Sequence, residues 1–431
     1  MRQILTILFI SLLFSNSALA KSLLDVLKEA YQNNTELNAE RENLIISEQE
    51  LKISKSDYLP SATITSSKSQ EDTNKLTNQS GGDATISDVD PLSTSIKIEQ
   101  TLIDFSRSAD YKKKKIGIDL AREKLLKKEQ EILYKAIEAY SSLIAAIEKE
   151  EINKKNVELK ISQLETDRIR LERGEVKLSD LAQSESSLAG AEAKYIQSQN
   201  ELITSKLNYE NVIGAIAAKE NLKKIYNAQV SIPKNLNEAK KISLEKSPEL
   251  IIAEIEYGQS ELDVKIARSD LSPTAKISLE RTYTDDLSAT YDEREKDVLQ
   301  ATVSWPFQFG GKNKSNVSKN LQAKGMKRLL LENAQKNNTQ SVTSSWSTLQ
   351  SSRSFLQAVQ SQVKAAEIAT EGISFEYESG SGRSTFDVLQ SRSSLINAKI
   401  NLAEAERSYL LAQYRVLKSV GLLNSDYLNL K

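Results

Sequence analysis

The chain carries its own pattern twice. Residues Leu23–Ile64 recur 213 positions later as Leu236–Ile277. The later parts repeat at an offset of 207, with these corresponding residues: Asp180 and Asp387, Gln183 and Gln390, Ala191 and Ala398, Gly214 and Gly421. Each copy is expected to hold short helices, two strands and a very long helical hairpin. A duplicated unit of this kind indicates a pseudo-symmetric assembly rather than a single catalytic cleft.

The N-terminus indicates export from the cytoplasm. Residues 1–20 hold one basic residue, Arg2, then an apolar run from Ile4 to Phe14 and a small-residue site at Ala18–Ala20. This pattern predicts a secretory signal peptide that is cleaved before Lys21. The apolar run is too short to span a bilayer, and a signal anchor is the alternative. Since the chain has no Cys and no His, we expect no lipid-anchored N-terminal Cys, no disulfide and no ordinary zinc site.

Composition narrows the class of protein further. The chain has 58 basic and 59 acidic residues, a balance that argues against bulk attraction to nucleic acid. Its six prolines lie between Pro60 and Pro306, and none falls in residues 92–232 or 307–431, which leaves room for very long helices. After the first 20 residues no run of 18 apolar residues occurs. A membrane role would therefore depend on strands or on a surface face.

The proline-free stretches show a seven-residue period. Large residues recur at Val388, Leu395, Leu402, Tyr409 and Val416, and each has a small residue three positions later. A heptad repeat keeps one seam against a partner helix, as in a coiled coil, and an ordinary antiparallel hairpin is the simpler interpretation. The stretches 107–173 and 311–377 each predict a helix of about 100 Å at 1.5 Å per residue.

Four segments alternate as strands do. Residues 96–105 and 299–307 alternate well, and residues 58–67 and 272–283 are weaker partners. Each pair flanks a polar insert, at 68–91 and at the acidic stretch 284–296, which we interpret as an external loop. The strands have about the 9–11 residues of a tilted membrane strand, and Trp305 with Phe307 could belong to an aromatic girdle.

Four strands cannot close a membrane barrel. An open edge in lipid leaves backbone groups unpaired, and single-chain barrels start at about eight strands. Several chains would therefore share one barrel. The alternative is two exposed hairpins on a soluble protein.

With these features the chain resembles the TolC family of outer-membrane efflux proteins over nearly its whole length after the signal. The marks are the duplication, the strand end at Gln100–Phe105, and two turns at Arg173–Leu181 and Tyr377–Leu389. The resemblance implies a mainly α fold completed by a membrane β-barrel. It also implies a homotrimer in the outer membrane with a twelve-stranded barrel and a twelve-helix periplasmic tunnel.

The resemblance also implies partners and a mechanism. The hairpin turns, with Gly174, Gly380 and Gly382, would contact a periplasmic adaptor protein that connects to an inner-membrane pump for efflux or type I secretion. The tunnel would be a passive duct that opens when its inner helices untwist. It would be no enzyme, and it would need no cofactor or metal.

Gate residues carry over from the family motifs. Tyr377, Arg383 and Asp387 match positions in the second turn, and Ser179 and Asp180 match the first, where they are expected to tie helices together at a constriction. Three copies of Asp387 would form an anionic ring that favours cations. A second acidic gate position falls on Gln390, and the second turn has an extra residue near Gly380. A helix cap is the alternative role, with Ser179 or Thr385 capping and Asp180 or Asp387 favouring the helix start.

These expectations divide the chain into nine segments. They are a signal peptide (1–20), N-terminal helices (21–57), a first β-hairpin (58–106), a first long helical hairpin (107–214), an equatorial linker (215–235), short helices (236–271), a second β-hairpin (272–310), a second long hairpin (311–421) and a C-terminal tail (422–431).

Two other functional classes remain in view. A periplasmic coiled-coil adaptor or structural interaction protein would lack a membrane barrel, but it would normally show one hairpin rather than a duplicated pair. An enzyme fits worst, because the sequence offers no nucleophile–base pair and no Gly-rich phosphate loop after a strand. The exported substrate and the pump class are not encoded in any recognisable motif.

Overall fold

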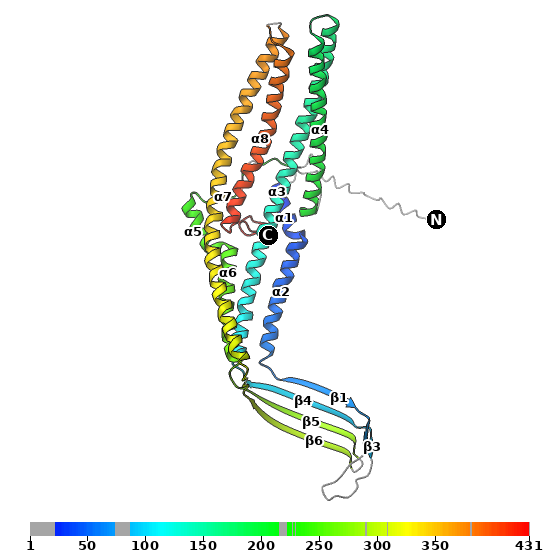
Figure 1. Cartoon of the computed structure of the whole chain (residues 1–431), viewed down its shortest axis with the longest axis vertical. Coiled ribbons are helices and arrows are strands. Elements are labelled where there is room, and N and C mark those ends of the chain that lie inside the picture. Colours follow the sequence, from blue (N-terminus) through cyan, green and yellow to red (C-terminus); the bar gives the residue numbers. More distant parts are fainter. Residues whose placement is uncertain are drawn as a thin grey trace, which may run out of the picture. The chain divides into compact units, whose positions relative to one another are not determined.

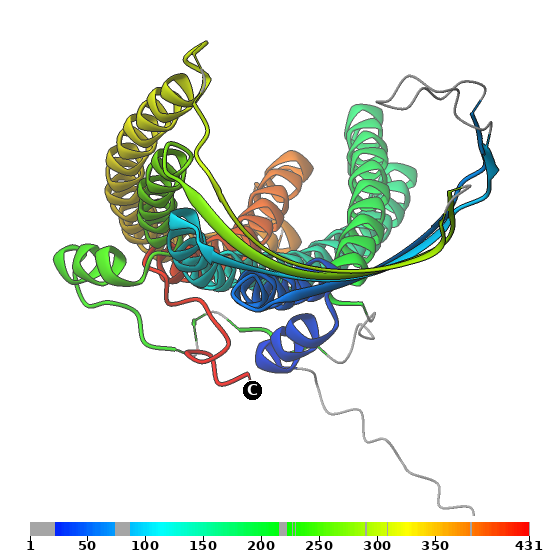
Figure 2. The ribbon, with the colours of Figure 1, turned by 90° about the horizontal axis from the view of Figure 1, so that it is seen from below.

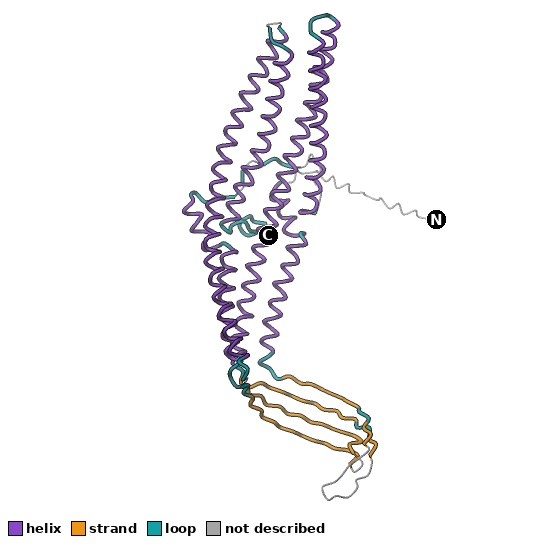
Figure 3. Tube along the Cα trace, viewed as in Figure 1, coloured by secondary structure: helices purple, strands orange, loops and turns teal. Residues whose placement is uncertain are grey.

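A computed structural model describes residues 22–73, 87–214, 222–225, 227–228, 230–288, 291–307, 309–379 and 382–430. The expected signal peptide, most of the first polar insert and Gly380 lie outside these residues. Helices make up most of the described residues, and strands and loops make up the rest (Figures 1 and 3). The helices are α1 (Leu23–Asn33), α2 (Thr35–Ser56), α3 (Phe105–Glu172), α4 (Leu178–Ile213), α5 (Leu236–Lys246), α6 (Pro248–Ser269), α7 (Lys312–Glu378) and α8 (Thr385–Ser419). The strands are β1 (Ser61–Lys68), β2 (Glu71–Thr73), β3 (Ser87–Val89), β4 (Leu92–Ile103), β5 (Thr274–Ser288) and β6 (Tyr291–Ser304).

The two long helices expected from the proline-free stretches are present. α3 has 68 residues and α7 has 67, and each returns through a shorter helix, α4 with 36 residues and α8 with 35. Apart from the short strands β2 and β3, the order of elements in the first half of the chain is repeated in the second half. The mainly helical fold with a duplicated unit is therefore confirmed.

Each expected stretch of short helix is broken once, at corresponding places. Asn34 separates α1 from α2, and its side-chain oxygen accepts a hydrogen bond from the Leu37 backbone N–H at 3.2 Å. Ser247 separates α5 from α6, and Pro248 is the first residue of α6. A proline fits the first helical position and disfavours helix in the residue before it, so the break is encoded locally in both copies.

The chain divides into two compact units, with boundaries inside α2, α3 and α7 and between α5 and α6. The first unit comprises the residues up to 39, 126–247 and those from 337 onward. Its main core gathers fully buried side chains from α1, α3, α4, α8 and the segment after α8. The largest of these are Leu23, Leu27, Leu133, Ile137, Tyr140, Leu143, Tyr209, Ile213, Tyr414 and Leu417.

The C-terminal segment of the first unit belongs to this core. Leu423, Leu428 and Leu430 are buried in it. Gly421 ends α8 with φ +83°, and a Cβ at this position would collide with the backbone carbonyl of Lys246. The close approach therefore requires both the left-handed backbone and the missing side chain of glycine.

The linker between the two halves also packs in the first unit. Lys224 forms ion pairs with Glu148 on α3 and with Glu406 on α8. The Tyr140 hydroxyl donates to the Lys223 carbonyl, and burial raises the pKa of Tyr140 to about 12. These bonds join both helical hairpins to one short segment of chain.

The second unit contains residues 40–125 and 248–336, and thus the whole main sheet. Four antiparallel strands follow the order β1-β4-β5-β6, and Figure 2 shows them as one continuous curved sheet. Within the described residues, β1 and β6 each pair on one side only. The sheet therefore has two open edges.

The two faces of the main sheet differ in polarity. The register places Ile64 beside Ile96 and Ile98 beside Leu279, which in turn lies beside Leu299. With Val303 these residues form an exposed apolar face, and the fractional exposure of Leu299 reaches 72% and that of Val303 73%. The opposite face carries Lys97, Glu99 and Lys276, whose ion pairs measure 3.1 and 2.9 Å. The alternation expected from the sequence is confirmed.

Two details differ from the expected strands. A β-bulge lies between Thr101 and Ile103, so Ile103 rather than Leu102 continues the pairing with β5. The acidic stretch 284–296, expected to be a loop, is mostly paired strand, with Asp285 opposite Glu293. That expectation was wrong because cross-strand pairing with β4 and β6 outweighs the low strand propensity of the acidic residues.

None of the described helices holds a segment that is long and apolar enough to cross a membrane.

Candidate functional site at the helical tips

The first tip turn is a glycine-ended helix terminus. Gly174 has φ +74°, its N–H donates to the Leu171 carbonyl at 2.9 Å, and the Glu175 N–H donates to the Arg170 carbonyl at 2.9 Å. This pair of bonds is the Schellman arrangement, which satisfies the last carbonyls of α3. The return helix α4 starts at Leu178, and the Asp180 carboxylate accepts from the Lys177 N–H at 3.0 Å.

The second tip turn also contains a glycine with positive φ, and its return helix, unlike α4, begins with a side-chain cap. Gly382 has φ +86°, and Ser384 caps α8 by accepting from the Asp387 N–H at 3.2 Å. The Asp387 carboxylate accepts from the Ser384 N–H at 3.0 Å, which completes a capping box. These bonds, with a smaller contribution from Arg383, lower the pKa of Asp387.

The caps lie one or two residues earlier than the sequence suggested. We expected Ser179 or Thr385 to cap the return helices, but the capping positions are Lys177 and Ser384. Asp180 and Asp387 do favour the helix starts, as expected. Ser179 and Gln390 are exposed, and the Gln390 carbonyl accepts from the Ser394 hydroxyl.

Arg383 forms its ion pair inside its own hairpin. Its Nε atom lies 2.6 Å from the Glu376 carboxylate on α7, and both side chains are nearly half exposed. This contact raises the pKa of Arg383. Among the described residues, Arg383 forms its polar contact with Glu376 and none with Ser179 or Asp180, so the ion pair connects the second turn to α7.

Tyr377 is the expected gate residue that links the two hairpins. Its hydroxyl lies 3.3 Å from Oδ1 of Asp167 on α3 and 3.0 Å from the Thr385 hydroxyl on α8. The Arg170 guanidinium lies over the Tyr377 ring, 4.5 Å from its centroid. One tyrosine thus connects α3, α7 and α8.

Asp167 lies at the centre of this network. Its side chain is fully buried, accepting from the Ser184 hydroxyl at 2.5 Å and from the Gln163 amide at 3.0 Å. Gln163 in turn accepts from Arg392 on α8 at 3.1 Å. A buried carboxylate without partners is costly, so these donors are needed to hold it in place.

Sequence reasoning missed Asp167 and most of its partners. We define the polar seam as the buried polar side chains in the last part of α3, from position 150 to position 167: Glu150, Asn153, Asn156, Lys160, Gln163 and Asp167. They recur at spacings of three and four, which is the signal for one helix face. We followed that period only for apolar and small residues.

Lys160 is the unusual member of the polar seam. It is 4% exposed, and its Nζ atom has no hydrogen-bond partner in the described part of the chain. Burial, with a contribution from Arg392, lowers the pKa of Lys160 to about 8. An unpartnered buried ammonium destabilises the packing around it.

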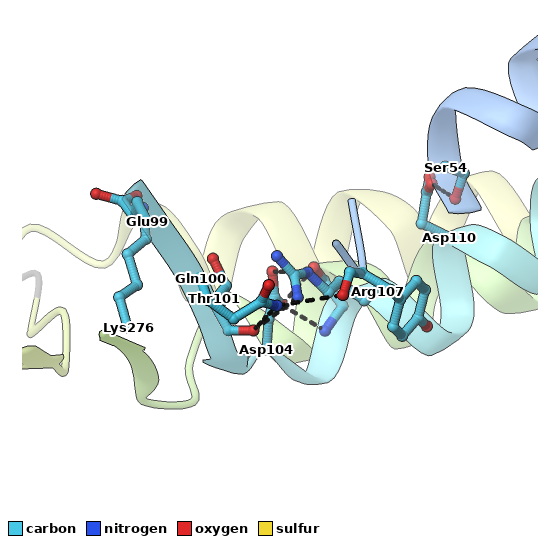
Figure 4. A network of polar contacts seen from close by, with 10 residues as sticks. Ser54, Glu99, Gln100, Thr101, Asp104, Arg107, Asp110 and Lys276 are labelled. Carbon is cyan, nitrogen blue, oxygen red and sulfur yellow. Dashed lines mark hydrogen bonds and ion pairs between the residues drawn. The ribbon is translucent and has the colours of Figure 1, made fainter. Parts of the chain in front are cut away.

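A second polar cluster lies where strands meet helices in the second unit (Figure 4). The Gln100 amide donates to the Tyr58 carbonyl at 3.2 Å, Asp104 accepts from the Ser106 N–H at 2.8 Å, and Arg107 donates to the Thr101 carbonyl at 3.0 Å. In the second copy Trp305 takes the part of Gln100: its indole N–H donates to the carbonyl of Leu271, which corresponds to Tyr58. The ring centroids of Trp305 and Phe307 lie 5.1 Å apart, and both side chains are exposed.

The model of the family described as outer membrane efflux protein matches residues 26–215 and 241–422, which is most of the chain in two blocks. The chain belongs to this family. The two matched blocks correspond to the duplication seen in the sequence and the fold.

Individual outer membrane efflux proteins resemble the chain over nearly its full length. The outer membrane efflux protein BepC of Brucella suis is 26% identical, over 98% of this chain and 90% of BepC. The outer membrane protein TolC of Escherichia coli is 22% identical, over 96% and 85% respectively. The crystal structure of the CmeC outer membrane channel of Campylobacter jejuni superposes with a TM-score of 0.80 at 16% identity, covering 93% of this chain and 85% of CmeC.

These findings establish the class of the protein. It is an outer-membrane protein of the efflux and secretion type, and proteins of this family are channels rather than enzymes. The expected fold class and outer-membrane location are thereby confirmed.

Proposed function

We propose that three copies of this chain form one passive exit duct across the outer membrane. The observation that carries this proposal is the four-stranded sheet with an exposed apolar face and two open edges, β1 and β6. An open edge in lipid leaves backbone donors and acceptors unsatisfied, so β1 of one copy must pair with β6 of the next. Three copies give twelve strands, a number within the range of known barrels.

The mass of the protein extracted from outer membranes, corrected for bound detergent, tests this assembly. Three chains per particle support the shared barrel. A monomer recovered from the periplasm without detergent would overturn it and favour a periplasmic adaptor or structural protein.

Disulfide cross-linking tests the strand order. The natural chain has no Cys, so introduced pairs form without competition. Thr63→Cys on β1 combined with Gln300→Cys or Thr302→Cys on β6 should give a covalent trimer on oxidation. Thr63→Cys alone is the control and should stay monomeric in denaturant.

We further propose that the hairpin tips are the gate and the contact surface for a periplasmic adaptor, which connects the duct to an inner-membrane pump for efflux or type I secretion. The network around Asp167 and Tyr377 supports a latch, because it joins the two hairpins through individually modest bonds. Opening would break these bonds as the inner helices untwist. Asp387, Arg383, Ser179, Asp180 and Gln390 would line or support the constriction.

A groove between the hairpins supports the docking part of the proposal. It measures about 340 Å³ and lies between α3, α7 and α8, with charged lining residues of both signs: Glu148, Glu151, Lys155, Lys224, Glu367, Lys399 and Glu406. Mixed charge of this kind suits a partner helix with complementary polar residues. The helices that line the groove, α3, α7 and α8, are the helices next to the turns that hold Gly174 and Gly382.

Photo-cross-linking from the tips tests docking. A photoreactive residue at Arg173 should capture the adaptor in cells, and one at Ser66 on β1 should not. Capture from Ser66 but not from the tips would contradict the proposal.

The proposed function also includes the division of the chain into nine segments given above. In it, Trp305 and Phe307 belong to an aromatic girdle.

A further inference from the structure

Unpaired cations gather at the four helix ends that join the main sheet. We define the basic collar as the exposed residues Lys52 and Lys55 on α2, Lys112 and Lys115 on α3, Lys265 and Arg268 on α6, and Lys312, Lys314 and Lys319 on α7. Each lies within about 15 Å of its helix end at 1.5 Å per residue. Within the described residues none of them forms an ion pair, and all belong to the second unit.

Most carboxylates near the basic collar are already engaged. Asp104 accepts from Ser106, Asp110 accepts from the Ser54 hydroxyl at 2.9 Å, and Asp263 pairs with Lys113 at 2.5 Å. Asp270 accepts from the Asn316 amide at 3.2 Å, and Glu50 pairs with Lys114 at 2.9 Å. Asp263 and Glu50 thus pair with lysines outside the basic collar, while the other three carboxylates accept from neutral donors. None of these five carboxylates forms an ion pair with a cation of the collar.

Farther from the sheet the same helices neutralise their cations. Lys324 pairs with Glu261 at 2.8 Å, and Lys327 pairs with Glu256 at 2.6 Å. Cations without an ion pair are therefore concentrated in the turns next to the sheet, although single exposed lysines farther along, such as Lys154 and Lys364, also lack one in the described residues. A concentration of this kind is not expected of an ordinary solvated helix face, where charges of both signs alternate.

The order of surfaces points to the partner. The exposed apolar face of the sheet is followed by exposed aromatic side chains at its helix end, namely Tyr58, Phe105, Trp305, Phe307 and Phe309, and then by the basic collar. Hydrocarbon, interface and phosphate headgroups follow one another in this order in a bilayer. Long Lys and Arg side chains near the interface reach the headgroups while their stems stay in apolar surroundings.

The opposite end of the sheet has the reverse charge. Residues 68–73, 89–92, 281–288 and 291–297 hold nine carboxylates and four cations. Among the described residues, the helix end of the sheet is therefore the end that attracts anionic headgroups. The two ends of the sheet therefore present opposite charge to the two leaflets of a bilayer.

We propose that the basic collar binds the anionic phospholipid headgroups of the leaflet on the helix side, the periplasmic leaflet of the outer membrane. This inference rests on the proposed membrane channel. The collar holds phosphate groups beside the helix ends and so fixes the depth of the sheet in the bilayer. Binding weakens with salt because the contacts lie at the water interface.

The test uses the full-length protein in vesicles of equal parts phosphatidylcholine and phosphatidylglycerol. The protein is extracted gently, and the two lipids that remain bound are quantified by mass spectrometry. The collar variant carries Lys55→Gln, Lys112→Gln, Arg268→Gln and Lys314→Gln, one change per helix. The matched control carries Lys154→Gln, Lys194→Gln, Lys241→Gln and Lys364→Gln, four exposed lysines of the first unit without an ion pair in the described residues.

We expect phosphatidylglycerol to be enriched on the parent and on the control, and the enrichment to fall about threefold or more in the collar variant. Raised salt should reduce the parent's enrichment, and added inorganic phosphate at the same ionic strength should do no more than salt does. Equal enrichment on parent and collar variant would overturn the inference. So would dissociation of the collar variant in pure phosphatidylcholine, because the cations would then serve contacts between subunits. Failure of the parent to enter any vesicle would instead remove the proposed channel itself.

Discussion

The hydroxyl of Tyr377 lies 3.3 Å from the carboxylate of Asp167, although the two residues are 210 positions apart and belong to different hairpins. Tyr377 is the next-to-last residue of α7, and Asp167 lies one to two turns before the end of α3. In the proposed duct, any movement that separates the hairpins at the tip must stretch this bond. Tyr377 is therefore the most direct position at which to test the latch.

Tyr377→Phe should raise the resting conductance of the channel in planar bilayers. The change removes one hydroxyl and its two contacts but keeps the ring under Arg170. A net cost of about 0.5–1.5 kcal/mol per hydrogen bond corresponds to a roughly two- to tenfold rise in open probability. Tyr195→Phe is the control, because its hydroxyl contacts Glu150 within the first hairpin. Equal conductance of Tyr377→Phe and the parent would argue against the latch.

Arg383→Ser should raise resting conductance as well, but less than Tyr377→Phe does. Its ion pair with Glu376 is exposed and lies within one hairpin, so its loss loosens the turn without separating the hairpins. Single-channel recordings of both variants at equal ionic strength provide the comparison. A larger effect of Arg383→Ser would mean that Arg383 contacts another subunit in the closed state.

Asp387→Ala should weaken the preference of the channel for cations and its block by multivalent cations. The structure also gives Asp387 a capping role, so two further variants separate charge from cap. Asp387→Asn removes the charge and retains an acceptor, whereas Ser384→Ala removes the cap and retains the charge. We expect the reversal potential in a salt gradient to change in both Asp387 variants and not in Ser384→Ala. If the reversal potentials of all three variants equal that of the parent, the anionic ring is contradicted.

Lys160→Met should stabilise the protein at pH 7. The pKa of Lys160 is about 8 in the fold against 10.5 for a free lysine, so the unfolded chain binds more protons between these values. The free energy of unfolding of the parent therefore rises as pH increases from 8 to 10.5, and the full penalty applies below pH 8. Removing the buried charge should gain about 1–3 kcal/mol. Thermal unfolding in detergent at pH 7 and pH 10.5 should show a parent–variant difference that shrinks at the higher pH.

Gly421→Ala should destabilise the protein far more than Gly214→Ala, its counterpart in the first copy. Both glycines have positive φ, but an added methyl group at Gly214 meets nothing within 4 Å, whereas at Gly421 it collides with the Lys246 carbonyl. We expect about 1 kcal/mol for Gly214→Ala and several times that for Gly421→Ala. Denaturant midpoints of the two variants make the comparison. Similar losses of stability in the two variants would mean that the backbone near Lys246 shifts to make room for the methyl group.

The sequence predicted the fold well where the signal was periodic and local. Proline-free heptads gave the long helices, and period-two alternation gave the strands and their apolar face. The acidic hairpin was misread as a loop because its pairing depends on distant strands. There Asp286, at φ +53°, accepts from the Asp90 N–H at 2.6 Å, a contact that local propensity does not contain.

The candidate site was only partly accessible to sequence reasoning. Tyr377 could be chosen because its turn has a recognisable motif. Asp167, Gln163 and Arg392 lie inside unbroken helices, and their meaning depends on which faces of α3, α7 and α8 meet in space. The caps were displaced by one or two residues, since the first helical residue is set by backbone geometry as well as by residue type.

Although α3 is one continuous helix, its inward face changes character along its length. Around Ile132, Ala139 and Ala146 that face is apolar and buried, whereas from Glu150 onward it is the polar seam. Separating the polar part from its neighbours exposes little hydrocarbon to water, and the released groups can be solvated at once. The backbone amides beyond Glu150 should therefore exchange with deuterium much faster than those near Tyr140. The same helix can thus stay rigid near Tyr140 and move beyond Glu150.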